Sequence, residues 1–289
     1  WRSQLFRRSP AFSPFRCAAL DLIKYRAGNK NENETLLIGS GYIDSEIIWG
    51  NYPREINKNE LIEAICNSYT DNEHVYFVAG GYDEIDKYGK PIHTPNAKIC
   101  SQNDNGISNW HNPKNEKICY PCEFEYFIKM LNGKISNQKP KGKARKIQVH
   151  GIRSHLTTKN RWHAKLIIKI RNGKPYALIV GSSNLTSRAF EYDQSWYTTN
   201  FECDVVIYPN EHRDMFDKTK YPNGTFLSTR PMNLKEIEEL SKTFIKEFLE
   251  SKVISNELAE AVFDKDYLKE VKKTDFKVYF NENPFNNLY

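Results

Sequence analysis

The sequence predicts an α/β protein in which a mixed, mostly parallel β-sheet is sandwiched between helices. A strand-like apolar run over residues 36–43 is followed by a helical pattern over 59–69 and a second strand-like run over 74–79. Strand, helix, strand is the start of a parallel unit with a right-handed crossover. An Asn-Gly turn at 172–173 between two apolar runs predicts a hairpin. Apolar residues at helical spacing over 234–249 predict an amphipathic helix that packs on the sheet.

The chain length suits one large domain with small additions, because 289 residues can bury a substantial core. We expect a basic N-terminal segment over residues 1–30, a main domain over 31–230 with a loop insertion at 80–121, and a helical region over 231–289 packed on the same domain. The four arginines and three serines of residues 1–20 are typical of an organellar transit segment, of a basic arm on nucleic acid or of a cloning remnant. We favour the last of these.

Composition and charge favour a soluble, cytoplasmic protein that does not contact a membrane. No apolar run approaches the roughly eighteen residues needed to cross a bilayer. Lys and Arg number 42 against 36 Asp and Glu, and this net charge of +6 leaves room for an anionic partner without requiring one. The six cysteines are expected to be reduced thiols or metal ligands in a cytosolic setting.

The loop insertion at 80–121 offers two interpretations. Its four soft side chains, Cys100, His111, Cys119 and Cys122, could hold a structural zinc ion, and the Cys-x-x-Cys spacing is that of zinc knuckles. In the other interpretation, which we favour, the last two cysteines are small hydrophobic residues that lead into a helix over 123–131.

Polar residues lie on both strands of the hairpin. His163 and Lys165 point to the same face, because side chains on a strand alternate. The second strand leads into Gly181, Ser182 and Asn184, and pairing of the two strands brings this turn to the same end as His163 and Lys165. An imidazole, an ammonium group, a hydroxyl and a carboxamide that converge in this way predict a phosphate pocket.

These residues resemble the H-x-K…G-S-x-N signature of the phospholipase D superfamily. His163 and Lys165 match its first half, and Ser182 and Asn184 match its second half. Glu202 lies where the family often places a supporting acid, and Glu191 and Asp204 compete for this role. The resemblance implies that residues 31–230 form a catalytic domain of the family's α-β-α type.

The family's frequent Asp, five residues after the Lys, is Ile170 here. This difference argues against the branches that act on lipids and is tolerated among the nucleases.

The resemblance also implies a mechanism. His163 would be the nucleophile and form a phosphohistidine intermediate that water then hydrolyses. Lys165 and Asn184 would bind the phosphate oxygens, Ser182 would donate a hydrogen bond, and Glu202 would orient a histidine ring. No metal is required for this chemistry.

The acid for the leaving oxygen must come from another group. No second H-x-K motif occurs in the chain, so we expect a twofold homodimer in which two motifs face each other. His155 as an acid from the same chain is a weaker alternative.

Basic residues precede and follow a strand expected over 147–152. A run of this kind is usually a solvated loop, but beside a phosphate pocket it would hold a polyanion backbone and make binding salt-dependent. The residues of this expected nucleic-acid face are Lys139, Lys141, Lys143, Arg145, Lys146, Arg153, Lys159 and Arg161.

We therefore expect a homodimeric hydrolase, a metal-independent phosphodiesterase that cleaves nucleic acid as an endonuclease, with DNA favoured over RNA. Within the superfamily the chain most resembles the single-motif endonucleases, including restriction-type enzymes. A lipid phosphodiesterase or transferase of phospholipase D type and a non-catalytic nucleic-acid-binding member of the family are the alternatives.

Overall fold

A computed structural model describes most of the expected elements. It covers residues 14–26, 32–43, 60–70, 73–80, 92–94, 97, 100, 119–137, 147–153, 165–186, 204–211, 227–250 and 254–274. Within these ranges the helices are α1 (Pro14–Lys24), α3 (Glu60–Ser68), α4 (Tyr120–Asn137), α6 (Leu234–Glu250), α7 (Asn256–Val262) and α8 (Lys265–Lys273). The strands are β1 (Glu34–Ser40), β2 (His74–Ala79), β3 (Gln148–Arg153), β4 (Lys165–Arg171), β5 (Lys174–Gly181), β6 (Asp204–Pro209) and β7 (Leu227–Met232).

All seven strands form one mixed sheet in the order β3-β2-β1-β4-β5-β6-β7. The pairs β1–β2, β2–β3 and β6–β7 are parallel, whereas β1–β4, β4–β5 and β5–β6 are antiparallel. The expectation of a mixed sheet is confirmed, but the expectation that it is mostly parallel is wrong. The reason is that the hairpin lies in the middle of the sheet, where each of its strands pairs in antiparallel fashion with both neighbours.

The hairpin turn has the chemistry that the sequence indicates. Asn172 and Gly173 connect β4 to β5 and have φ values of 51° and 77°. Positive φ at both central residues is the requirement of a type I′ turn, which matches the twist of the flanking strands, and Asn-Gly adopts it at little cost.

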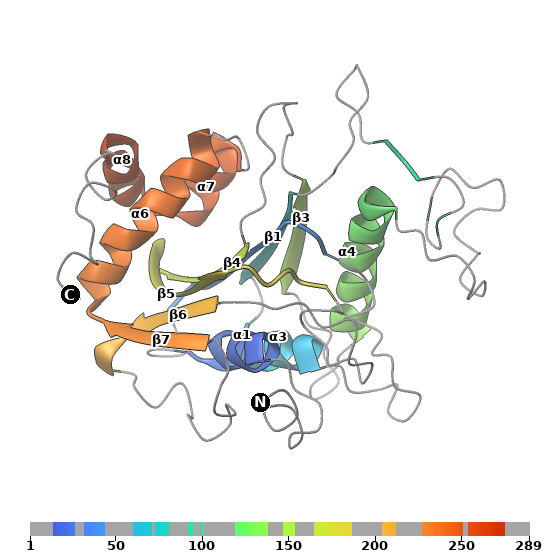
Figure 1. Ribbon diagram of the computed structural model, residues 1–289, viewed down its shortest axis with the longest axis horizontal. Helices are drawn as coiled ribbons and strands as arrows, with labels where there is room; N and C mark the ends of the chain where they lie inside the picture. The colour runs from blue at the N-terminus through green and yellow to red at the C-terminus, as the bar shows by residue number, and fades with distance from the viewer. Residues whose placement is uncertain are drawn as a thin grey trace, which may run out of the picture.

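Helices cover both faces of the sheet, so the expected sandwich is confirmed (Figure 1). Helices α1, α3 and α4 pack on one face against buried residues such as Ile38, Phe77 and Ile167. Helices α6, α7 and α8 pack on the other face, where alternate residues such as Leu37 and Ile168 are buried. This alternation follows from the two-residue period of a strand. None of the described helices is both long and apolar enough to cross a membrane.

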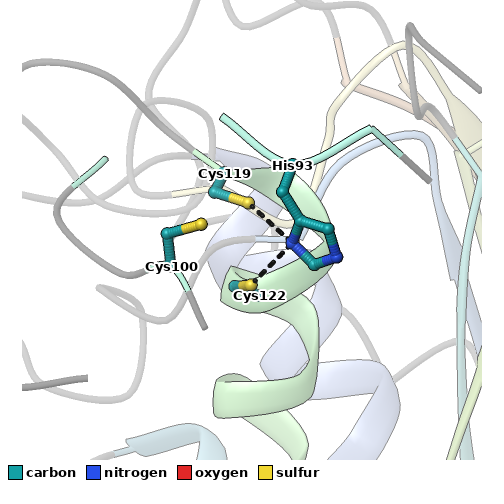
Figure 2. A group of neighbouring side chains, drawn as sticks. All are labelled: His93, Cys100, Cys119 and Cys122. Carbon is teal, nitrogen blue, oxygen red and sulfur yellow. Dashed lines mark hydrogen bonds between the residues drawn. The ribbon is translucent and has the colours of Figure 1, made fainter. Parts of the chain in front are cut away.

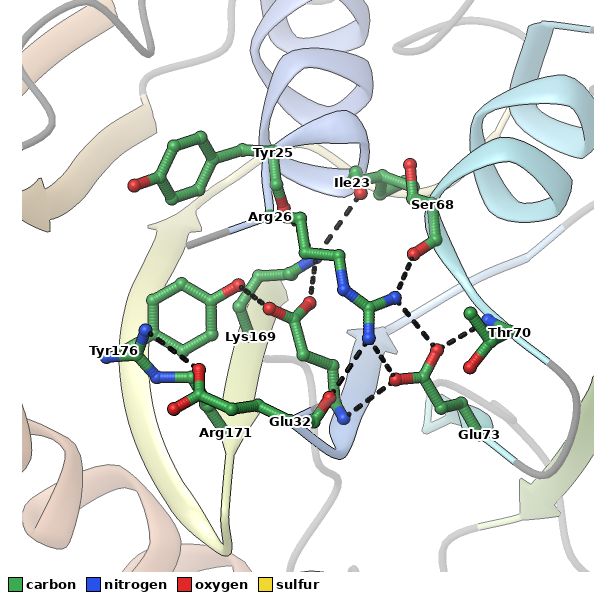
Figure 3. A network of polar contacts seen from close by, with 11 residues as sticks. Ile23, Tyr25, Arg26, Glu32, Ser68, Thr70, Glu73, Lys169, Arg171 and Tyr176 are labelled. Carbon is green, nitrogen blue, oxygen red and sulfur yellow. Dashed lines mark hydrogen bonds and ion pairs between the residues drawn. The ribbon is translucent and has the colours of Figure 1, made fainter. Parts of the chain in front are cut away.

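Buried charges tie α1 to the strands (Figure 3). Arg26, just after α1, pairs with Glu73 at 2.6 Å. Lys169 of β4 pairs with Glu34 of β1 at 3.0 Å. Both ion pairs lie toward the end of the sheet at which β1 begins. The motif residues Lys165, Ser182 and Asn184 lie at the opposite end, where β1 ends.

Candidate functional site

The strand register brings Lys165, from the first half of the H-x-K…G-S-x-N motif, to the same end of the sheet as Gly181, where the second half begins. Lys165, the first residue of β4, lies directly opposite Gly181, the last residue of β5. Gly181 in turn lies opposite Asp204 of β6, and on the other side of β4 the residue after Lys165 pairs with Gly39 of β1. The residues that follow Gly181 therefore start at the edge where β1 ends and where β4 and β6 begin.

Asn184 is held by the end of β1. The backbone N–H of Tyr42 donates to Asn184 Oδ1 at 3.1 Å, and the Ser40 hydroxyl lies 3.4 Å from the same oxygen. The backbone N–H of Leu185 donates to Ser40 Oγ at 2.8 Å. Because the amide oxygen accepts from a backbone N–H, the side chain is oriented with its nitrogen as the remaining donor. A donor fixed in this way suits an anionic ligand oxygen.

The turn after β5 is anchored by an acid that the motif does not include. Ser183 Oγ donates to Asp204 Oδ2 at 2.5 Å, and the Ser183 backbone N–H donates to Asp204 Oδ1 at 3.3 Å. Ser183 and Asp204 are buried, whereas Ser182 is exposed. The two serines thus have different surroundings, with Ser183 holding the turn and Ser182 at the surface.

Lys165 is buried at the start of β4. It shares a strand face with Ile167, which packs in the core under α1, α3 and α4. The side chain of Leu185 belongs to the same core. Lys165 and the turn that carries Asn184 thus lie on the sheet face that α1, α3 and α4 cover.

Several expected site residues lie outside the described ranges. They are His163 and Glu202 of the motif set, His155, and Lys139, Lys141, Lys143, Arg145, Lys146, Lys159 and Arg161 of the basic set. Arg153 is described: it forms an ion pair with Glu125 and donates to the Pro121 carbonyl at 3.0 Å, so its guanidinium contacts the first turns of α4.

A second group of side chains could hold a metal ion (Figure 2). His93, Cys100, Cys119 and Cys122 each offer one ligand atom, and these atoms lie within 4.8 Å of one another. The three cysteines are those that the sequence indicates as candidate ligands. The fourth side chain is His93, while His111, the expected fourth ligand, lies outside the described residues. The distances of His93 and His111 from the cysteines in the sequence do not indicate which of the two is the ligand.

The contacts within this cluster are close. His93 Nδ1 lies 3.6 Å from Cys119 Sγ and 3.3 Å from Cys122 Sγ (Figure 2). The backbone N–H of Thr94 donates to Cys119 Sγ at 3.5 Å. The adjacent Cys122 sulfur and burial together raise the pKa of the Cys119 thiol. Four soft ligands with this arrangement are compatible with a structural metal.

A pocket of about 390 Å³ lies at the opposite end of the sheet, lined by Asn33, His74, Asn172 and Asp264 among others. His74 is the first residue of β2, and its ring contacts that of His150, with 3.0 Å between Nδ1 of the first and Nε2 of the second. The pocket contains none of the motif residues. We assign the candidate site to the sheet end that carries Lys165 and Asn184, because the motif side chains offer groups suited to a phosphate and the pocket contains none of them.

The fold and the site define a class: an α/β protein with a mixed sheet, a polar turn at one sheet end and a separate cysteine-histidine cluster. Comparison with protein-family models finds no match. A search of curated proteins also finds none.

Proposed function

We propose that the protein is a metal-independent phosphodiesterase of phospholipase D type that cleaves nucleic acid, with DNA favoured over RNA. The observation that supports this best is the register of the hairpin, in which Lys165 faces Gly181 and the turn with Ser182 and Asn184 begins at the same sheet end. An ammonium group, a hydroxyl and an oriented carboxamide at one sheet end suit the non-bridging oxygens of a phosphodiester.

On this proposal His163 begins the reaction. Its neutral imidazole attacks phosphorus, a P–N bond forms, and the P–O bond to the leaving group breaks as an acid protonates the leaving oxygen. Water then attacks the phosphohistidine and gives its proton to the group that acted as the acid, while the P–N bond breaks and the neutral imidazole is regenerated. Lys165 and Asn184 stabilise the charge that builds on the phosphate oxygens, and Ser182 adds a hydrogen bond. Glu202 orients a histidine ring.

The second acid would come from a second copy of the chain. A twofold axis near the motif would place two His163 residues across one phosphate, one as nucleophile and one as acid. His155 of the same chain is the alternative source of this proton.

Nucleic acid is favoured over lipid for two reasons. The basic run at 139–146 would bind a polyanion backbone. In addition, Ile170, at the position where the family frequently has an Asp, is buried in the core beneath α6. The branches of the resembling family that act on lipids usually keep that Asp, so its loss counts against them. An acid there would lie on the sheet face opposite Lys165, so the loss leaves the proposed phosphate-binding groups in place.

A metal, on this proposal, takes no part in the chemistry. The cysteine-histidine cluster offers four protein ligands, and a closed shell of this kind leaves no open position for a substrate. The described cysteines form no disulfide, which fits the reducing, cytoplasmic setting that we propose.

The test is cleavage of labelled single- and double-stranded DNA and RNA in excess EDTA, with paired variants. His163→Ala and Lys165→Met should each lower the cleavage rate at least about a hundredfold. Their controls, His74→Ala and Lys174→Met, change the same residue types at the far end of the sheet and should cleave like the parent protein. Circular dichroism checks that each variant is folded.

Each outcome of this test has its own interpretation. Cleavage that EDTA abolishes would contradict metal-independent chemistry, unless zinc but not Mg²⁺ restores it, which would assign the requirement to the cysteine-histidine cluster. Cleavage that survives EDTA and disappears only with His163→Ala and Lys165→Met supports the proposal. Equal cleavage by His163→Ala and the parent protein would rule out the phosphohistidine mechanism. If no polymer is cleaved but liposomes are bound, the lipid phosphodiesterase becomes the better interpretation, and nucleic-acid binding without cleavage would favour the non-catalytic alternative.

A further inference from the structure

We propose that His93, Cys100, Cys119 and Cys122 bind one zinc ion, which fixes the N-terminus of α4 and, through it, the backbone that holds Asn184. This inference concerns a structural metal and is independent of the proposed nuclease activity. It rests on the ligand geometry, on the burial of the cluster and on a chain of contacts from α4 to the end of β1.

The spacing of the ligand atoms matches a tetrahedral shell. With Zn–S near 2.3 Å and Zn–N near 2.0–2.1 Å, tetrahedral geometry places sulfur and nitrogen ligands about 3.5 Å apart and two sulfurs about 3.8 Å apart. His93 Nδ1 lies 3.6 Å from Cys119 Sγ and 3.3 Å from Cys122 Sγ. All four ligand atoms lie within 4.8 Å of one another, so no pair needs to close by more than about 1 Å to reach these spacings.

The ligand types favour zinc over the hard divalent cations. Three thiolates and one imidazole in a tetrahedral arrangement suit Zn²⁺, whereas Mg²⁺ and Ca²⁺ require oxygen ligands. The three cysteines are buried and His93 is partly buried, so the ion would be shielded from water. The Thr94 backbone N–H that donates to Cys119 Sγ would offset part of the thiolate charge.

The ion would join distant parts of the chain. Cys119 immediately precedes α4 and Cys122 lies in its first turn, whereas His93 is 26 residues before Cys119. The carbonyl of Cys119 also accepts the backbone hydrogen bond from Glu123 at 2.9 Å that starts the helix. Zinc would therefore fix the start of α4 to the segment around His93.

Contacts lead from this helix start to the candidate site. Tyr120 lies between the two cysteines, and its ring centroid is 4.5 Å from that of Tyr42. The backbone N–H of Tyr42 is the donor to Asn184 Oδ1 at 3.1 Å. Loss of the ion would loosen the start of α4, and with it the Tyr120 ring that contacts the ring of Tyr42.

The first experiment measures metal content. Native mass spectrometry of the full chain, purified under reducing conditions, should show a single zinc ion per chain. His93→Ala, Cys100→Ser and Cys119→Ser should lose it, and their controls, His111→Ala and Cys66→Ser, should retain it. The pair of histidine variants is decisive, because His111 is the fourth ligand expected from the sequence, whereas His93 is the histidine that lies in the cluster. Zinc retained by His93→Ala would overturn the assigned ligand set.

A further measurement covers the case in which the cysteine variants fail to fold. Cobalt in place of zinc in the parent protein should give the thiolate charge-transfer and tetrahedral d–d bands of an S₃N site. Metal-free parent protein in which Cys119 and Cys122 form a disulfide would overturn the proposal.

The link to the candidate site is tested by hydrogen exchange. Chelation of zinc from the parent protein should speed exchange of the Tyr42 amide by roughly tenfold or more, because local opening becomes easier. Exchange of the Ile245 amide in α6, on the other face of the sheet, should not change. Equal protection of the Tyr42 amide with and without zinc would refute the coupling, even if the metal itself is bound.

Discussion

The buried pair of Lys169 and Glu34 gives the sharpest test of the fold. Their side chains are 0% and 1% exposed and 3.0 Å apart. Lys169 Nζ also donates to the carbonyls of Ile23, at 3.3 Å, and Tyr25, at 2.8 Å (Figure 3). The phenol of Tyr176 donates to the Glu34 carboxylate at 3.0 Å. We predict that Lys169→Met, which keeps the length of the side chain but removes its charge, strongly destabilises the protein.

The expected size follows from burial. Removing one partner of a buried ion pair leaves the other charge without compensation and costs about 3–5 kcal/mol. At roughly 2–4 °C per kcal/mol for a chain of this size, the melting temperature should fall by about 6–20 °C. Lys174→Met is the matched control, because Lys174 of β5 also faces a glutamate, Glu238, but at 3.5 Å with 49% exposure. Loss of an exposed pair should cost at most about 1 kcal/mol.

Urea unfolding followed by circular dichroism measures both variants. In addition, Lys169→Met combined with Glu34→Gln should be less destabilised than the sum of the two single variants, because the double change leaves no unpaired buried charge. Gln keeps an oxygen that can accept from Tyr176. Equal, small effects of Lys169→Met and Lys174→Met, or strict additivity in the double variant, would refute the reasoning.

Two further predictions concern pH and glycine. Burial by itself would raise the pKa of Glu73, but hydrogen bonds from Arg26 and from backbone N–H groups outweigh it and hold the pKa below its ordinary value. The stabilisation by the Glu73 carboxylate is therefore complete above its unfolded pKa of about 4.3 and is lost as the pH falls through the lower folded pKa. Glu73→Gln should reduce this loss of stability in acid, measured as urea unfolding midpoints against pH. An unchanged dependence of the midpoint on pH would contradict the prediction. Gly173→Ala should destabilise by about 2 kcal/mol or more, because φ is 77° and a Cβ would lie 2.4 Å from the Asp264 nitrogen. Gly133→Ala in α4, where a Cβ meets nothing within 4 Å, should instead stabilise by about 0.5–1 kcal/mol; thermal melts that show the same sign for both would contradict the argument.

The elements that the sequence predicts well are those with strong local signals. The Asn172-Gly173 turn fixes the hairpin through its own conformational preference, and the helical period over 234–249 corresponds to α6. The helix expected over 123–131 is confirmed but longer, because α4 spans Tyr120–Asn137. The parallel fraction of the sheet was not predictable from local patterns, because it depends on which strands become neighbours.

Buried charges were also beyond local reasoning. Lys169 and Glu34 are charged residues, which are ordinarily exposed, and nothing in their immediate sequence indicates that they meet across two strands. The apolar residues of α1 lie in a segment whose arginines suggest a basic arm, yet Leu22 and Ile23 are buried in the core. Partners that bury such residues come from distant parts of the chain, and a single sequence does not identify them.

In both candidate sites the sequence identifies some of the residues and not the others. Cys119 and Cys122 are recognisable as possible ligands because both lie within one four-residue Cys-x-x-Cys motif. His93 and His111 do not lie at a characteristic distance from this motif, so the sequence does not show which of them is a ligand. At the hairpin, the assignment of His163 and Glu202 stays a prediction.

The residues that hold the turn after β5 are Ser40, Tyr42 and Asp204, none of which belongs to the motif. The Tyr42 to Asn184 contact spans 142 residues of sequence, and Asp204 reaches Ser183 from the next strand of the sheet. A motif specifies the groups that would touch a phosphate, but the groups that orient them depend on which strands end at the same edge. Asp204→Ala should therefore lower the cleavage rate as the loss of a motif residue does, because it releases the Ser183 turn, although Asp204 is not among the phosphate-binding groups that we propose. Cleavage by this variant at the rate of the parent protein would contradict the argument.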